Sequence, residues 1–180
     1  MSFENPSSVD DLLNYRIARL LSSSGALVIR ICEGRYGISR REWRLIALLH
    51  AHGALSPSEL AAHAHTDRAL VSRAVNDLAA KHFVVRLTSP SDRRRATIEL
   101  TPKGHKLYDE FFPETAGING RVLQILTPEQ LAAFDLALTL LTKQAETLSE
   151  TDIGTVKANR RHGGSRRLVQ SKSELPGPQL

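Results

Sequence analysis

The stretch SPSDRRRATIELTPKG at residues 89–104 passes from a turn through a strand to the start of a helix. Ser-Pro-Ser-Asp is typical of a turn, because proline fixes φ and the serine and aspartate side chains bond their own backbone. Ala96, Ile98 and Leu100 then alternate with polar residues, which is the period of a half-buried strand. Since the run FVVRLT at 83–88 precedes the turn, the sequence predicts a β-hairpin with three consecutive arginines at its tip.

Two short helices are predicted just before this hairpin. The pattern SPSE at 56–59 is a capping box with proline at the first helical position, which predicts a helix over about 57–64. Thr66 is expected to cap the next helix. Its buried side is expected to carry Val71, Val75 and Leu78. Two short helices joined by a tight connection are typical of a helix-turn-helix motif.

Longer helices are predicted on both sides of this motif. Apolar residues recur at helical spacing over 10–33 and again over 39–52. The dipeptide Thr-Pro at 101–102 starts another helix, which we expect to be interrupted or bent near Pro113 and Gly117. The chain is therefore predicted to be mainly α, with one small β element.

A last helix begins at the capping pattern TPEQ, residues 127–130. Its apolar residues are alternately three and four positions apart, which is the spacing of a heptad seam that needs a partner helix. They are Leu131, Phe134, Leu138, Leu141, Ala145 and Leu148.

The charges are distributed unevenly along the chain, whose formal net charge is +5. Residues 66–106 hold nine basic and four acidic side chains, whereas residues 107–153 hold two basic and eight acidic ones. Residues 154–180 hold six basic side chains and one acidic one. A basic segment inside a folded region that is otherwise neutral or acidic indicates a localised surface for a polyanion.

The sequence argues against a membrane or secreted protein. No apolar run approaches the roughly 18 residues of a membrane span, and the N-terminal MSFENPSSVDD does not resemble a secretory signal. Cys32 is the single cysteine, which fits a reducing compartment. We therefore expect a cytoplasmic protein without a membrane partner.

The sequence also gives no support for an enzyme, a cofactor or a metal site. No Ser-His-Asp pattern, glycine-rich phosphate loop or pair of carboxylates stands out, so no catalytic residue is assigned. Paired histidines two positions apart point to different faces of a helix, and no cysteine or carboxylate cluster accompanies them. These histidines are His50, His52, His63 and His65.

The second short helix has a face suited to a DNA groove. Opposite its predicted buried side lie the candidate contacts Ala69, Ser72, Arg73 and Asn76. Arginine can bridge guanine, asparagine can pair with adenine, and small residues let the backbone approach. Arg68 opposes the helix dipole, and a phosphate or base partner would explain its position. An ordinary solvated face is the alternative.

The tip of the hairpin adds a second candidate contact to double-stranded DNA. Arg93, Arg94 and Arg95 repel one another, and phosphates would neutralise them. Arginine is also favoured in narrow minor grooves. Asp92 can hold the guanidinium of Arg94 in one orientation. The alternative for these arginines alone is a solvated loop.

Residues 66–86 and 92–104 together resemble the multiple-antibiotic-resistance regulator (MarR) family. The hairpin pattern of that family, Asp-x-Arg followed by Leu-Thr-x-x-Gly, is matched by Asp92, Arg94, Leu100, Thr101 and Gly104. The resemblance covers about residues 10–148 and departs at His82, where glycine is common. Histidine tolerates a left-handed backbone better than most residues, so the fold is expected to survive this departure.

The resemblance implies a winged helix-turn-helix with N- and C-terminal dimerisation helices. It divides the chain into a dimerisation helix at 1–36, a DNA-binding region at 37–104, dimerisation helices at 105–150 and a basic tail at 151–180. The tail is poor in apolar residues and expected to be disordered. Arg94 matches the family arginine that enters the minor groove.

Family members are mostly repressors that small, often aromatic or anionic, ligands release from DNA. Such ligands bind between the first helix and the winged domain. By this resemblance Arg16 or Arg19 would hold a carboxylate near Ser23, and Tyr15 or Trp43 would stack on a ring. Surface or dimer salt bridges are the alternative role for these side chains.

The predicted function is that of a ligand-responsive transcriptional regulator, a homodimeric repressor that binds an inverted-repeat operator. Two alternatives remain open at this point. The first is a constitutive or architectural DNA-binding protein without an effector. The second is a redox sensor based on Cys32, in which Arg30 and Arg35 would lower the pKa of the thiol.

Overall fold

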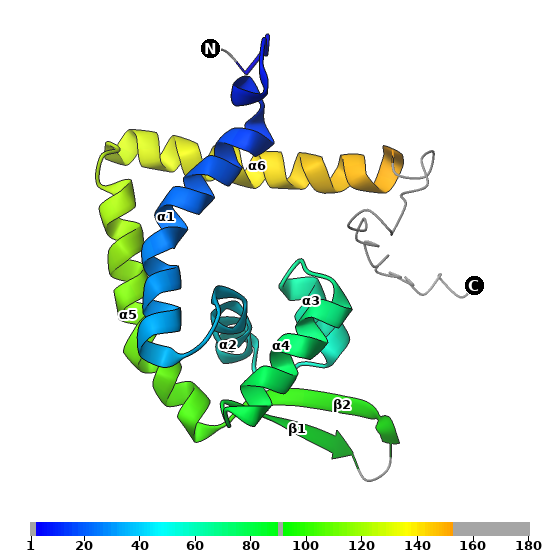
Figure 1. Cartoon of the computed structure of the whole chain (residues 1–180). Helices are drawn as coiled ribbons and strands as arrows, with labels where there is room; N and C mark the ends of the chain where they lie inside the picture. The colour runs from blue at the N-terminus through cyan, green and yellow to red at the C-terminus, as the bar shows by residue number, and fades with distance from the viewer. Residues whose placement is uncertain (1–2, 90–91, 153–180) are drawn as a thin grey trace, which may run out of the picture. The chain divides into compact units, whose positions relative to one another are not determined.

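The computed structural model describes residues 3–89 and 92–152 (Figure 1). The chain divides into two compact units, Met1–Leu126 and Thr127–Leu180. The elements in chain order are η1 Val9–Asp11, α1 Leu13–Tyr36, α2 Arg40–His52, α3 Pro57–His63, α4 Arg68–Ala80, β1 Val84–Ser89, β2 Asp92–Leu100, α5 Pro102–Leu123 and α6 Pro128–Asp152. This confirms a mainly helical fold with one small β element. Nearly all of the predicted tail, from residue 153, lies outside the described residues.

Helices α3 and α4 and the strands β1 and β2 form the predicted winged helix-turn-helix motif (Figure 1). The capping box of α3 is formed: Ser56 Oγ accepts from the N–H of Glu59 at 3.2 Å, and Glu59 Oε2 accepts from the N–H of Ser56 at 2.8 Å. Strands β1 and β2 pair antiparallel. The backbone of Leu55 adds a bridge to Ile98, with N···O distances of 3.0 and 2.8 Å. The start of α3 is thereby tied to the hairpin.

The core of the first unit is shared by α2, α3, α4, the hairpin and α5. The side chains predicted to be buried on α4, Val71, Val75 and Leu78, are completely inaccessible to solvent. Other side chains with almost no exposure are Ile38, Leu45, Ile46, Leu49, Leu60, Ile98 and Phe111. Because α4 contributes one face to this core, its opposite face is left for another partner.

The junction between α4, the hairpin and α5 is built around the backbone carbonyl of Phe83. The N–H of Thr101 donates to this carbonyl at 3.1 Å, and Thr101 Oγ1 accepts from the N–H of Gly104 at 3.1 Å. A Cβ atom on Gly104 would lie 2.2 Å from the Phe83 oxygen, so the backbone can approach this closely only at glycine. His82 has φ 61°, which confirms the left-handed conformation expected there.

A partly buried ion pair between Lys81 and Glu42 ties the start of α2 to the end of α4. Glu42 is 4% exposed, accepts from the N–H of Ser39 at 2.6 Å in a capping box, and accepts from Lys81 Nζ at 2.7 Å. Burial alone would raise the pKa of Glu42, but the hydrogen bonds from Lys81 and Ser39 outweigh it and lower the pKa. The carboxylate is therefore charged at neutral pH and holds the C-terminal end of α4 in place.

Two local expectations are corrected. Helix α5 is not interrupted at Pro113, because Leu107, Phe111 and Ile118 lie on one buried face and packing holds the helix together across the proline. The cap of α4 is Asp67 rather than Thr66: its Oδ1 accepts from the N–H of Ala69 at 2.8 Å. Helix α4 therefore begins at Arg68, one residue later than expected, and residues 64–67 connect it to α3.

Helices α1 and α6 each leave several large apolar side chains exposed. On α1 these are Ile17, Leu20, Leu21 and Leu27. Every α6 residue from 128 to 148 is exposed, including the predicted heptad positions. None of the helices within the described residues combines the length and apolarity needed to cross a membrane.

Gly104→Ala is expected to destabilise the protein by about 1–3 kcal/mol, because the new methyl group overlaps the Phe83 carbonyl and must push α5 away from the hairpin. The matched control is Gly120→Ala in the same helix, where no atom lies within 4 Å of the added Cβ. The control should leave the melting temperature unchanged or raise it, because alanine favours helix over glycine. Thermal unfolding of both variants measures the difference. Equal melting temperatures would show that the junction tolerates a side chain.

Candidate nucleic-acid interface

Helix α4 presents one exposed face opposite its buried one. All the candidate contacts predicted on this helix are exposed: Arg68, Ala69, Ser72, Arg73 and Asn76. No carboxylate among the described residues pairs with Arg73, so its guanidinium is available to a ligand. The capping carboxylate of Asp67 and the core contacts of Val71 hold the helix beneath this face. The arrangement is a helix, anchored in the core, on which Arg73 lies among small side chains without a carboxylate partner in the described part of the chain.

Asn76 and Arg86 form a contact that the sequence did not predict. Arg86 lies on β1 and its Nη2 donates to Asn76 Oδ1 at 2.7 Å. Both residues are exposed. The alternation of FVVRLT could have indicated that Arg86 shares a strand face with buried Val84, but no local pattern identifies a partner on a different element.

Arg68, for which only a phosphate or base partner was expected, also has a partner within the fold. Its Nη2 donates to Ser58 Oγ on α3. The same side chain borders a groove of about 520 Å³ between the starts of α3 and α4 and strand β2. The groove is lined by Ser56, Pro57, Ser58, Glu59, Arg68, Ala96 and Thr97. Arg68 therefore connects the two helices at the edge of the exposed face.

The hairpin extends away from α4 to a tip (Figure 1). The backbone of Arg93, Arg94 and Arg95 belongs to β2, which begins at Asp92, so these residues lie at the tip end of the strand as predicted. Their side chains lie outside the described part of the structure. Their roles, and that of Asp92, remain predictions.

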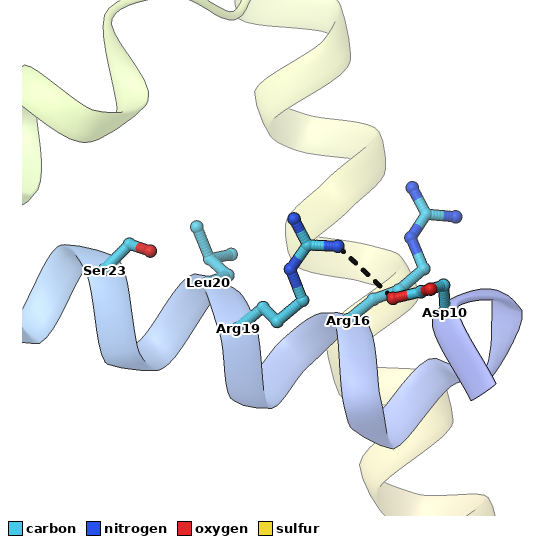
Figure 2. Close-up of a pocket in the computed structure, with 5 residues that line it drawn as sticks. All are labelled: Asp10, Arg16, Arg19, Leu20 and Ser23. Carbon is cyan, nitrogen blue, oxygen red and sulfur yellow. Dashed lines mark ion pairs between the residues drawn. The ribbon is translucent and has the colours of Figure 1, made fainter.

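A second candidate site is an open groove on α1, shown in Figure 2. It has a volume of about 510 Å³ and is lined by Asp10, Arg16, Arg19, Leu20 and Ser23. Arg19 lies 3.6 Å from Asp10, so part of its charge is balanced. The guanidinium of Arg16 lies 4.4 Å from the ring centre of Phe3, and no carboxylate of the described residues pairs with it. Within the described residues, the groove thus combines the guanidinium of Arg16, which no carboxylate there balances, with the apolar side chain of Leu20.

Comparison with known proteins decides the family. A model of the MarR family matches residues 36–95. The chain is 30% identical over 112 residues to the HTH-type transcriptional regulator FarR of Neisseria gonorrhoeae, an alignment that covers 62% of this chain and 77% of FarR. The chain belongs to the MarR family. It is a transcriptional regulator and not an enzyme.

Solved structures support the same fold. BpsR of Bordetella bronchiseptica, whose DNA binding is regulated by 6-hydroxynicotinic acid, aligns with a TM-score of 0.67 at 20% identity and covers 77% of this chain and 98% of BpsR. NadR in complex with 4-hydroxyphenylacetate aligns with a TM-score of 0.63 at 26% identity, again over 77% of this chain and 98% of NadR.

The structure brings together only part of the effector site that the MarR resemblance implied. Arg16, Arg19 and Ser23 line one groove, whereas Tyr15 is exposed on α1 without lining it. Trp43 does not line this groove either, and its expected stacking role stays a prediction. Its ring is buried in the core, 4.5 Å from Phe111 and 5.7 Å from Tyr108 between ring centres. A tryptophan on an amphipathic helix is placed by its packing partners, which the sequence alone did not identify.

The redox alternative for this MarR protein is not supported by the surroundings of Cys32. The thiol is completely buried, and burial, together with the charge of Glu33, raises its pKa to about 11. Arg35, expected to lower that pKa, instead pairs with Glu114 on α5. Cys32 is therefore a packing residue of α1.

Cys32 is expected to resist disulfide-exchange reagents at pH 7 in the folded protein, because a pKa near 11 leaves about a hundredfold less thiolate than a pKa of 9. The same reagent should label the chain promptly after unfolding in denaturant, which serves as the control. Spectroscopic thiol titration measures both rates. Rapid, stoichiometric labelling of the native protein would contradict the assignment.

Proposed function

We propose that this MarR-family regulator is a homodimeric repressor that binds an inverted-repeat operator and is released from it by a small aromatic acid or a related effector. The observation that carries the proposal is the exposed face of α4. There, no carboxylate of the described residues pairs with Arg73, its neighbours are small, and a hairpin with three arginines at the tip end of β2 follows. A groove of DNA provides both the base edges and the phosphates that such a surface can bind.

Exposed apolar surface supports the homodimer. Helix α6 is 25 residues long, and its exposed leucines and phenylalanine recur at heptad spacing. A helix with such a stripe gains most of its stability from packing against a partner. The exposed stripe of α1 requires cover in the same way. A second copy of the chain supplies two equivalent faces, and two equivalent winged motifs then require half-sites about one helical turn, ~10 bp, apart.

The contacts proposed with DNA divide by chemistry. Arg73 and Asn76 read base edges, while Ala69 and Ser72 allow close approach of the helix. Arg68 binds a phosphate at the edge of the helix face. The hairpin residues Asp92, Arg93, Arg94 and Arg95 supply minor-groove and phosphate contacts, with Arg94 in the groove.

The groove on α1 is the proposed effector site. The unbalanced guanidinium of Arg16 suits a carboxylate, Arg19 and Ser23 add donors, and Leu20 supplies an apolar wall. Two neighbours of the same fold, BpsR and NadR, are described with a hydroxylated aromatic acid. The competing function is a constitutive DNA-binding protein, in which these arginines only form surface contacts.

Arg73→Ala and Arg94→Ala are expected to weaken binding of the full chain to duplexes that the wild-type protein enriches from a randomised pool. Loss of Arg73 should weaken the binding free energy for the preferred duplex by about 1–3 kcal/mol. It should also relax the base preference at one position of the site. Loss of Arg94 should also make the salt dependence shallower, because fewer counterions are released. Binding titrations at several salt concentrations measure both the loss of affinity and the salt dependence. Two chains are expected to bind each inverted repeat.

The control for charge alone is Arg121→Ala, which removes an exposed arginine from the far end of α5. It should bind like the wild type. If Arg73→Ala, Arg94→Ala and Arg121→Ala all bind equally well, the basic surface of the winged motif is only solvated.

Arg16→Ala is expected to keep DNA binding and lose the response to an aromatic acid, for which 4-hydroxyphenylacetate is the first probe. An effector releases DNA only if it binds the DNA-incompetent form more tightly than the competent one. DNA titrations with and without the acid measure the response. Arg30→Ala on the same helix, outside the groove, is the matched control. Full response in both variants would place the effector elsewhere, and no response of the wild type to a panel of aromatic acids would favour the constitutive protein.

A further inference from the structure

Arg86 connects the hairpin to the exposed face of α4. It lies on β1 opposite Ile98 of β2, and its Nη2 donates to Asn76 Oδ1 at 2.7 Å. Its side chain also borders a small pocket of about 100 Å³ beneath the helix, together with Ser72 and Val75. The guanidinium therefore lies between the hairpin and the helix face rather than pointing along the strand into solvent.

The chemistry of this contact selects one orientation of the Asn76 side chain. A carboxamide has an acceptor and a donor end of nearly equal size, and a free side chain can turn either end toward a ligand. A guanidinium has only donors, so it binds the oxygen. With Oδ1 held by Arg86, Nδ2 must point away from the hairpin. One lone pair of Oδ1 remains free, because an amide oxygen accepts two hydrogen bonds.

We propose that Arg86 is a positioning residue that fixes the amide of Asn76 and so determines the base pair that Asn76 prefers. Adenine requires an amide oxygen to accept from N6 and an amide nitrogen to donate to N7, in a fixed order across the groove. Arg86 presents the amide in one such order before DNA binds, so less side-chain freedom is lost on binding. The inference rests on the proposed function, because Asn76 must read a base for its orientation to matter.

This role differs from two others that Arg86 could have. A phosphate contact would raise affinity for every sequence and steepen the salt dependence. A purely structural contact would stabilise the fold, yet an exposed pair of this kind contributes little to stability. Only a positioning role ties the effect of Arg86 to the presence of Asn76 and to a single position of the DNA site.

The test is a double-mutant cycle in which the measured quantity is the base preference at each position of the DNA site. Wild type, Arg86→Ala, Asn76→Ala and the double variant, all as full-length chains, select duplexes from the same randomised pool. We expect Asn76→Ala to lower the preference for one base pair per half-site by about five- to 150-fold. Arg86→Ala should lower it at the same position. The double variant should show no further loss, because Arg86 acts through Asn76.

Two further variants sharpen the test. Arg86→Lys, which also has only donors but lacks the planar fork, should retain part of the preference at that position. Arg121→Ala controls for the lost charge and should leave every position unchanged. Thermal unfolding is expected to place all the variants within a few degrees of the wild type, so that a change in preference is not a folding defect.

The outcomes separate the hypotheses. A uniform loss of affinity in Arg86→Ala with unchanged preference would make Arg86 a phosphate contact and overturn the inference, while the proposed DNA binding stands. A loss at a position that Asn76→Ala leaves intact, or an additive loss in the double variant, would overturn it as well. A wild-type chain that enriches no sequence would contradict the proposed function, and with it this inference.

Discussion

The arrangement of the winged motif depends on one backbone group, the carbonyl of Phe83. It accepts from the N–H of Thr101 at 3.1 Å and occupies the space that Gly104 leaves open. The residue before it, His82, turns the chain with φ 61° from the end of α4 into β1. Since the hairpin begins and ends beside this carbonyl, the same contact positions α4, both strands and the start of α5. A regulator that reads DNA with a helix and a hairpin together needs that relative position fixed.

Two further ties of α4 lie at the same end of the helix. Lys81 Nζ reaches the buried carboxylate of Glu42 at 2.7 Å, while the backbone carbonyl of Lys81 accepts from Lys103 Nζ at 2.9 Å. Glu42 in turn caps α2 through Ser39. The C-terminal end of α4 is thus held by α2, by α5 and by the hairpin. The exposed residues farther toward its N-terminus are left free of core contacts, which is where the candidate base-reading side chains lie.

The sequence predicted those parts of the structure that local chemistry determines. The capping box at Ser56, the alternation that ends at Leu100 and the buried stripe of α4 are set by neighbouring residues, and each is confirmed. The expected break at Pro113 is wrong because Phe111 and Ile118 are held by distant parts of the core. The packing partners of Trp43 and the Arg86–Asn76 contact were not predicted for the same reason, because both depend on which elements lie next to each other in the fold. The roles of the candidate DNA and effector residues stay predictions.

Counting the basic residues overstates how many side chains of the winged region have all their hydrogen-bond donors available to DNA bases. Residues 66–106 contain nine basic side chains, but Lys81 is bound to Glu42, Arg86 to Asn76 and Arg68 to Ser58. Their charges still attract a polyanion, because electrostatic attraction acts over a Debye length of about 8–10 Å and does not need a hydrogen bond. Their hydrogen-bond donors are partly used, however, and lysine and arginine side chains can contact a base edge only as donors. In the proposed function, electrostatic attraction and base reading are therefore assigned to different members of one basic surface, and a charge count alone reports only the first.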